Sequence, residues 1–256
     1  MKKITSYQIL TILATLLTIT VNGLANGLPL NGQGTGEISD RFSILFVPAG
    51  YVFSIWGLIY LGLIAFTIYQ ALPAQNDNRL LRKISPAYWV GSLANTAWIF
   101  MWHYEFFPYT VVLMLMILIT LIAIFRDISA AGSGLNNVQK WFVRIPFSIY
   151  LGWISVATIA NVTQILFFFD WGGWGISPTV WALIMLVVAT ILGLLMQWRE
   201  RAVSYVLVLV WAFWGIGVSQ AGTLLVANTA RGAAIVLIAA AILMLFLKPG
   251  SKPAVK

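Results

Sequence analysis

The sequence has no cysteine and only one histidine, His103, among its 256 residues. A chain without thiols has no disulfide framework and no thiolate nucleophile, and a single histidine cannot supply the His cluster of a zinc or haem site. Charged residues make up only 9% of the chain, whereas they are about a quarter of a typical soluble domain. With 61% hydrophobic residues, this composition excludes a water-soluble globule and indicates an integral membrane protein.

Ionisable side chains are also missing from the middle of the long apolar runs, where no Lys, Asp or Glu occurs. Pumps and ion-coupled transporters generally need such groups inside the membrane, and a retinal Schiff base needs a mid-helix lysine. The net charge of +8 comes from basic residues spread in small groups between the apolar runs. This spread predicts topology signals and argues against a nucleic-acid partner.

The apolar residues fall into runs of about 18 to 25 residues, each long enough to cross a hydrocarbon layer about 30 Å thick. We expect an all-α integral membrane protein with about eight transmembrane helices. A five-helix ligand-binding bundle would occupy residues 1–168 and a three-helix segment residues 169–256. The expected spans are residues 4–24, 46–71, 86–103, 108–127, 142–168, 178–197, 203–221 and 227–247.

The first apolar run follows Lys2 and Lys3, a pattern shared by signal peptides and retained start-transfer helices. It is longer than the usual core of a signal peptide, of about 7–15 residues, so we favour a retained helix. Residues 27–43 follow it and are rich in Gly and Asn, too polar to lie in lipid. A loop of this length is often a lid, and we expect one here.

Lys and Arg alternate between the two sides of the expected helices. They are frequent at the N-terminus, in residues 79–83, 126–144 and 199–201 and in the tail, and sparse in the other connections. By the positive-inside bias, both termini face the cytoplasm, which requires an even number of spans. The inner cell membrane is the expected location. Cleavage of the first helix would leave seven spans in the same orientation.

Aromatic and carboxamide side chains recur at helical spacing in three runs. Trp56 and Tyr60 lie four residues apart, as do residues on one helix face, and Asn95 shares a face with Trp98 in the next run. In the fifth run the same face carries Tyr150, Trp153, Ala157 and Asn161.

We expect these three faces to meet around an internal pocket. Trp56, Tyr60, Trp98, Tyr150 and Trp153 would be its stacking walls, Asn95 and Asn161 its hydrogen-bond donors, and Ala157 would leave space for a ligand. The alternative is that the amides make ordinary interhelical hydrogen bonds and the rings serve core packing or the interfacial belt. Trp171 and Trp174 are assigned to that belt.

These motifs resemble the tryptophan-rich sensory protein / translocator protein family, also called the peripheral-type benzodiazepine receptor family. Its second-helix pattern of Pro, aromatic-Val-Phe and Trp-x-x-x-Tyr matches the segment from Pro48 through Tyr51-Val52-Phe53 to Tyr60. Its Asn-x-x-Trp and Tyr-x-x-Trp-x-x-x-Ala-x-x-x-Asn patterns match the third and fifth runs. The resemblance covers about residues 5–168. One departure is Ile149, where the family has a proline.

The resemblance implies a five-helix bundle with a cavity lined by the first, second, third and fifth helices and closed by the loop after the first. It also implies binding of tetrapyrroles such as protoporphyrin, of sterol-like lipids and of benzodiazepine-type drugs, without a required cofactor. The last three helices have no counterpart in the five-helix pattern. We hypothesise that they cover a face that family members bury by dimerising, although the oligomeric state stays open.

The sequence therefore predicts a membrane protein that binds a planar hydrophobic ligand for sensing, transfer or scavenging. Its expected partners are the lipid bilayer and a hydrophobic small molecule. One alternative is a light-dependent porphyrin-degrading enzyme, although no acid/base pair supports turnover. Another is a facilitative carrier of a small neutral solute, which needs no buried charge.

Overall fold

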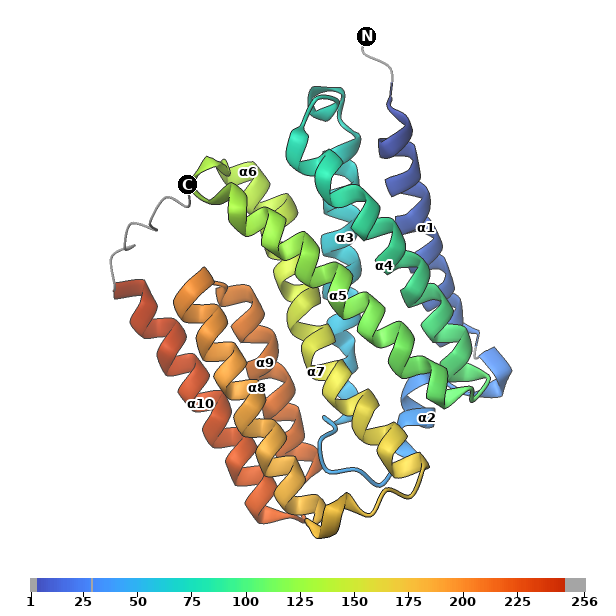
Figure 1. Cartoon of the computed structure of the whole chain (residues 1–256), viewed down its shortest axis with the longest axis vertical. Helices are drawn as coiled ribbons and strands as arrows, with labels where there is room; N and C mark the ends of the chain where they lie inside the picture. The colour runs from blue at the N-terminus through green and yellow to red at the C-terminus, as the bar shows by residue number, and fades with distance from the viewer. Residues whose placement is uncertain (1–3, 29, 247–256) are drawn as a thin grey trace.

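Long helices account for most of the computed structural model, which describes residues 4–28 and 30–246, and no strand occurs in those ranges. Eight helices of 17 residues or more lie there: α1 (Ser6–Gly27), α3 (Ile55–Ala71), α4 (Arg79–His103), α5 (Phe107–Ala131), α7 (Ile145–Phe168), α8 (Pro178–Glu200), α9 (Val203–Ser219) and α10 (Leu224–Phe246) (Figure 1). Within the described ranges, six helical segments are long and apolar enough to cross a membrane, and α9 is a shorter apolar helix. The expectation of an all-α, multi-pass membrane protein is confirmed.

Short helical turns connect these helices. They are η1 (Leu30–Gly32), α2 (Thr35–Asp40), η2 (Gly50–Ser54), η3 (Pro73–Gln75), η4 (Gly132–Gly134), α6 (Asn137–Gln139), the π-helical η5 (Lys140–Arg144) and η6 (Gly173–Gly175).

The starts of α3 and α4 differ from the predicted boundaries, and at α4 a side-chain cap is the reason. The α4 helix begins at Arg79 rather than near residue 86, since the Asn78 side chain accepts hydrogen bonds from the backbone N–H groups of Leu80 and Leu81. The basic residues of the expected loop therefore lie on the first turns of α4. Conversely, residues 50–54 form the η2 turn, and the regular helix α3 starts only at Ile55.

The α5 helix also continues past its predicted end, to Ala131. Asp127 stays on the helix and pairs with Lys83 of α4, with 2.7 Å between carboxylate and ammonium. The helix stops at Gly132, whose φ of +48° is strained for residues with a Cβ.

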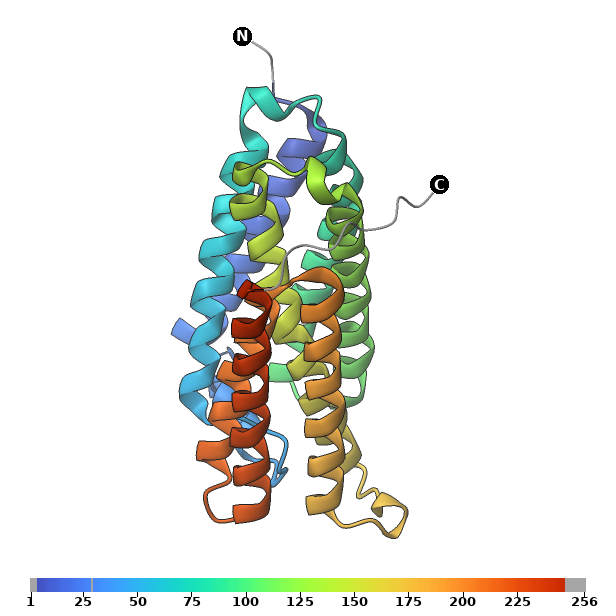
Figure 2. The ribbon, with the colours of Figure 1, turned by 90° about the vertical axis from the view of Figure 1, so that its left-hand side faces the viewer.

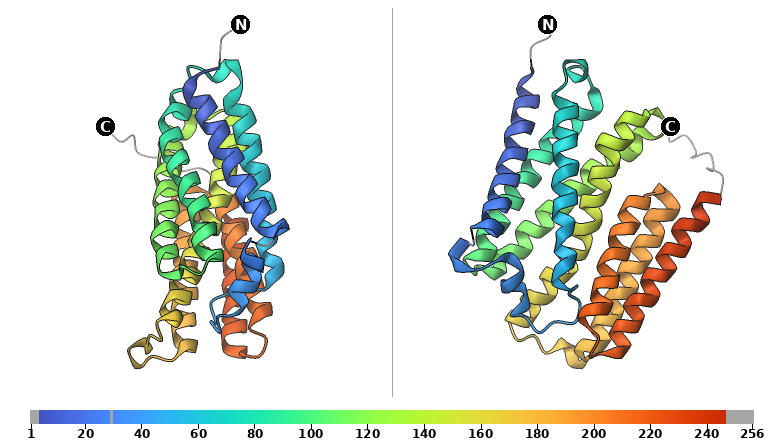
Figure 3. Two further views of the ribbon diagram at one scale, coloured as in Figure 1. Left: turned by 90° about the vertical axis from the view of Figure 1, so that its right-hand side faces the viewer. Right: turned by 180° about the vertical axis from the view of Figure 1, so that it is seen from behind.

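The α7 helix stands between two groups of helices. Figure 1 and the reverse view in Figure 3 show α8, α9 and α10 together on one side of α7, with α1, α3, α4 and α5 on the other. The group of α8, α9 and α10 contacts the rest of the protein mainly where α9 packs against α7. Gly152 allows this approach, because a Cβ there would lie 3.0 Å from the Tyr205 carbonyl oxygen.

The connections separate into two ends, as the charge alternation predicts. Figure 2 shows the start of α1 and the α3–α4 connection at one end, and the α7–α8 and α9–α10 connections at the other. Lys2, Lys3 and the tail lysines Lys248, Lys252 and Lys256, which the predicted orientation also uses, lie outside the described residues.

A polar stripe runs along the inner face of α1, within the first predicted apolar run. All of its members are buried, at 3% exposure or less: Gln8, Thr11, Thr15, Thr18 and Asn22. Gln8 Nε2 donates to the Gln70 carbonyl at 2.7 Å, and Thr15 Oγ1 lies 2.6 Å from the Tyr88 hydroxyl. These bonds fix the rotation of α1 against α3 and α4, and so direct Asn22 toward the interior.

Candidate functional site

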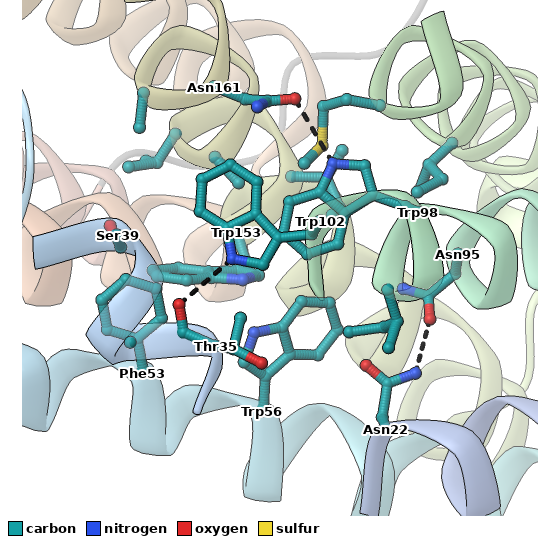
Figure 4. A pocket seen from close by; sticks show the side chains of 18 of the residues that line it. Asn22, Thr35, Ser39, Phe53, Trp56, Asn95, Trp98, Trp102, Trp153 and Asn161 are labelled. Atoms are coloured by element: carbon teal, nitrogen blue, oxygen red, sulfur yellow. Dashed lines mark hydrogen bonds between the residues drawn. The ribbon is translucent and has the colours of Figure 1, made fainter. Parts of the chain in front are cut away.

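A cavity of about 200 Å³ lies among α1, α3, α4, α5 and α7, beneath the short helix α2 (Figure 4). Its aromatic lining consists of Phe53, Trp56, Tyr60, Trp98, Trp102 and Trp153. Its polar lining consists of Asn22, Thr35, Ser39, Asn95, Asn161 and Gln164. No Asp, Glu, Lys, Arg or His is among the described lining residues. The cavity is therefore aromatic and without charged side chains.

Two stacked ring pairs form opposite parts of the wall. Trp56 stacks on Tyr60 along α3, with ring centroids 5.5 Å apart and planes 24° apart. Trp98 stacks on Trp102 along α4, at 5.1 Å and 14°. The i, i+4 spacing of each pair produces this stacking. Trp153 of α7 then meets Trp56 edge to face at 6.3 Å.

The two carboxamides predicted as donors are held in interhelical hydrogen bonds. Asn95 Oδ1 accepts from Asn22 Nδ2 at 2.7 Å, and its Nδ2 donates to the Tyr150 hydroxyl at 3.0 Å. Asn161 Oδ1 accepts from the Trp98 indole at 3.3 Å, and its Nδ2 donates to Thr110 Oγ1 at 3.0 Å. Each amide nitrogen keeps a second hydrogen that these bonds do not use.

Trp153 differs from its neighbours in its indole nitrogen. The N–H groups of Trp98 and Trp102 donate to Asn161 and to the Thr35 carbonyl, the latter at 3.2 Å. Trp153 is only 2% exposed, and its Nε1 has no hydrogen-bond partner within the described residues. An unpaired buried donor costs about 1–3 kcal/mol. A bound molecule with an acceptor would remove that cost.

Residues 30–43, the described part of the predicted lid after Pro29, are docked over the cavity. Ile38 of α2 is fully buried, and Ser39 accepts a hydrogen bond from Gln164 Nε2 of α7 at 3.0 Å. The fully buried His103 donates through Nδ1 to the Leu30 carbonyl at 3.1 Å, and its Nε2 lies 2.9 Å from Thr35 Oγ1. His103 lies under the lid, because α4 ends there and the lid folds back over it.

The structure brings seven of the eight predicted site residues to the cavity: Trp56, Tyr60, Asn95, Trp98, Trp153, Ala157 and Asn161. Tyr150 is buried outside the lining, where its ring meets Trp56 edge to face at 5.9 Å. The cavity is lined by the predicted first, second, third and fifth long helices, and Met114 and Ile117 of α5 join them. Trp171 and Trp174 do not line the cavity, and their rings cluster with that of Trp181. The Trp174 side chain is 81% exposed.

Sequence reasoning missed several lining residues. Phe53 belongs to the aromatic-Val-Phe pattern of the family, but its role in the pocket was not predicted from the sequence. Ser39 lines the cavity from the lid. Asn22 could have been found, since it ends the polar series at three- and four-residue spacing along α1. Ser39 carries no periodic signal, because α2 has only six residues.

Comparison with known proteins identifies one family. The model of the TSPO-like protein family matches residues 8–243. This match runs past α7 and includes helices α8 and α9 and most of α10, for which the five-helix pattern has no counterpart. Neither the curated proteins nor the solved structures gave a match. Because the family model covers most of the chain, including every long helix, this membrane protein belongs to the TSPO-like protein family.

Proposed function

We propose that this protein binds a planar, largely apolar molecule in the cavity beneath α2, and that a tetrapyrrole is the best candidate. Flat conjugated rings gain from contact with indole and phenol faces, and the lining offers two stacked pairs. Binding of this kind would serve sensing, transfer or scavenging of the ligand.

Four indole rings and the unpartnered N–H of Trp153 in one uncharged cavity carry this proposal. Ligand pockets typically combine a mainly apolar lining with a few polar groups that fix orientation. The Trp153 donor is such a group, since it has no partner to give up when a ligand arrives. The absence of charged side chains from the described lining favours a neutral acceptor on the part of the ligand that enters the cavity.

The size of the cavity sets a condition on tetrapyrrole binding. Pockets for drug-sized ligands measure roughly 300–1,000 Å³, whereas this cavity measures about 200 Å³. A tetrapyrrole ring therefore requires outward movement of the lid. The polar edge of such a ligand, including any carboxylates, would point toward the lid and water, because the inner lining cannot neutralise it.

A ligand screen on purified protein tests the proposal. We expect protoporphyrin IX to raise the melting temperature and to quench tryptophan fluorescence, with haem and cholesterol as comparison ligands. Saturable quenching at low micromolar concentration would support the site, whereas an unchanged melting temperature and unquenched fluorescence with all three probes would contradict it. Irradiating the complex and following porphyrin absorbance separates stable binding from light-driven degradation.

A further inference from the structure

We propose that helix α9, in the C-terminal part of the chain, supports the wall of the binding cavity, with Trp211 and Gly215 as positioning residues. The effect on ligand affinity rests on the function proposed above, whereas the effect on the cavity itself does not. No residue of α8, α9 or α10 is among the described lining residues. Any influence of these helices on the ligand must therefore act through the elements that they hold.

The first such element is the turn that precedes α3. The backbone N–H of Ala49 donates to the Gly215 carbonyl of α9 at 3.1 Å, and the Trp211 indole donates to the Val52 carbonyl at 3.1 Å. Backbone groups outside regular helices need partners when they lie within a membrane protein. Here α9 supplies two of these partners to η2 and its N-cap.

Contact between α9 and this turn is very close. A Cβ on Gly215 would lie 2.2 Å from Val52 Cγ2 and 3.2 Å from Pro48 Cβ. Atoms at the shorter separation would overlap, so glycine is what allows the turn to reach this depth. Tyr51 adds an edge-to-face contact with the Trp211 ring at 5.3 Å.

The same turn forms part of the cavity wall. Pro48 and Phe53, which flank the contact with α9, both line the cavity. The Phe53 ring meets Trp153 edge to face at 5.6 Å. Displacing Val52 therefore displaces a ring that touches the indole bearing the unpartnered N–H.

Helix α9 also contacts α7, the helix that carries Trp153. The Tyr205 hydroxyl donates to Ser155 Oγ of α7 at 3.0 Å, close to Trp153 in the chain. Gly152, on the same helix, lets the α9 backbone approach. One helix thus fixes both η2 and α7, which carry Phe53 and Trp153. Because coupling between sites is reciprocal, a ligand that moves this wall must also shift α9.

Two substitutions with matched controls test the proposal. Gly215→Val places a branched side chain against Val52, and Gly232→Val makes the same change on α10, where nothing lies within 4 Å. Trp211→Phe removes the hydrogen bond to Val52, and Trp214→Phe removes an indole from the same helix at a half-exposed position. The two tryptophan variants lose the same fluorophore, so their quenching curves are directly comparable.

Two readouts are measured on each full-length variant. The first is the dissociation constant for protoporphyrin IX. The second needs no ligand: it is the rate at which a small maleimide labels Ala160→Cys, a cavity-lining position in a chain without other thiols. We expect Gly215→Val and Trp211→Phe to change both quantities at least threefold, and Gly232→Val and Trp214→Phe to leave both within a factor of two of the parent.

The outcomes separate this proposal from the proposed function. If the parent binds no porphyrin but the labelling rates change as expected, α9 supports the cavity and the proposed ligand is wrong. If the parent binds porphyrin and neither α9 variant changes affinity or labelling, the support role is overturned. Should Gly215→Val fail to fold, the comparison of Trp211→Phe with Trp214→Phe decides. A lowered melting temperature with unchanged affinity and labelling would show a purely structural contact and would also overturn the proposal.

Discussion

At the scale of single residues, the cavity contains two indoles that are already hydrogen-bonded and one buried indole that is not. Trp98 and Trp102 use their N–H groups within the protein, whereas that of Trp153 has no partner within the described residues. The first two rings are therefore fixed walls for stacking, and Trp153 is a wall that also offers a donor. Substitutions at Trp98 should therefore lower affinity through lost stacking, whereas substitutions at Trp153 should also change the preference for ligands that carry an acceptor.

Replacing Trp98 with Ala should weaken porphyrin binding by about 3- to 10-fold, because the stacked face is lost and an aromatic contact is worth about 0.5–1.5 kcal/mol. Asn161→Ala should have a similar effect, since it leaves the Trp98 indole without its acceptor. Fluorescence quenching titrations measure both. Trp198→Ala, at a position that is 72% exposed and remote from the lining, is the control. Unchanged affinity in both site variants would reject the pocket assignment.

Trp153→Phe should affect ligands according to whether they carry an acceptor. Fluorenone and fluorene are a suitable pair, since both are flat and they differ by one carbonyl group. The parent should bind fluorenone more tightly by about 5- to 10-fold, as expected for a hydrogen bond of about 1 kcal/mol, and Trp153→Phe should remove that preference. Competition with protoporphyrin IX measures both affinities. Equal affinity of the parent for the two compounds would show that the indole N–H is not a ligand donor.

At the scale of elements, the short segment that includes η1 and α2 is held over the cavity by buried and partly buried hydrogen bonds. The His103 ring contacts it at two points, and the His103 backbone carbonyl accepts a hydrogen bond from Asn31. Trp102 and Gln164 each donate one further hydrogen bond to it. The outer ion pair between Arg41 and Glu105, at 2.9 Å, is more than 40% exposed at both side chains. Exposed pairs contribute little, so the buried histidine should dominate lid closure.

His103→Ala should accelerate ligand release roughly tenfold, because it leaves two partly buried polar groups of the lid without partners at a cost of about 1–3 kcal/mol. Stopped-flow recovery of tryptophan fluorescence after mixing the complex with excess apoprotein trap measures the rate. Glu105→Gln is the control and should change the rate less than about threefold. A larger effect of Glu105→Gln than of His103→Ala would mean that the surface pair, not the buried contact, holds the lid.

At the scale of the whole molecule, the predicted topology has an even number of membrane spans, which would put both ends of the chain on one side of the membrane. The basic connections at residues 79–83 and 126–144 lie toward the end where α1 starts, and the positive-inside bias assigns that end to the cytoplasm. The orientation and the inner-membrane location remain predictions.

Single cysteines introduced into this cysteine-free chain test the orientation. Ala74→Cys lies in η3 at the basic end, and Ala221→Cys lies between α9 and α10 at the other, both exposed. In intact spheroplasts, a membrane-impermeant maleimide should label Ala221→Cys and leave Ala74→Cys unlabelled until the cells are lysed. The reverse pattern would invert the predicted topology.

The position of α8, α9 and α10 against α7 bears on the oligomeric state. These helices pack against α7 and cover one side of the bundle formed by α1, α3, α4, α5 and α7. The hypothesis that they cover a face which family members bury by dimerising requires this arrangement. We therefore expect the full-length protein to be a monomer in mild detergent, measured by light scattering after size-exclusion chromatography. A tight dimer that is cross-linked through α1, α3 or α4 would refute the hypothesis.

Much of the fold followed from local patterns. Apolar run length predicted about eight helices, and i, i+4 spacing predicted that Trp56 and Tyr60 share a face, where they stack. The errors arose where a few polar side chains decide the structure and the average composition of the segment does not reveal them. Asn78 starts α4 early, and the buried polar stripe of α1 went unnoticed because its members are diluted among leucines.

The sequence by itself determined the membrane environment, the all-helical fold class, the family resemblance and seven of the residues around the cavity, because all of these depend on run length and on helical periodicity. Only the tertiary structure decided that Tyr150 lies outside the lining, that Trp153 is the donor without a partner and that α9 supports the turn before α3. Those features depend on how helices far apart in the chain are rotated and how closely they approach. Periodicity defines the faces of a helix but not the partner that each face meets.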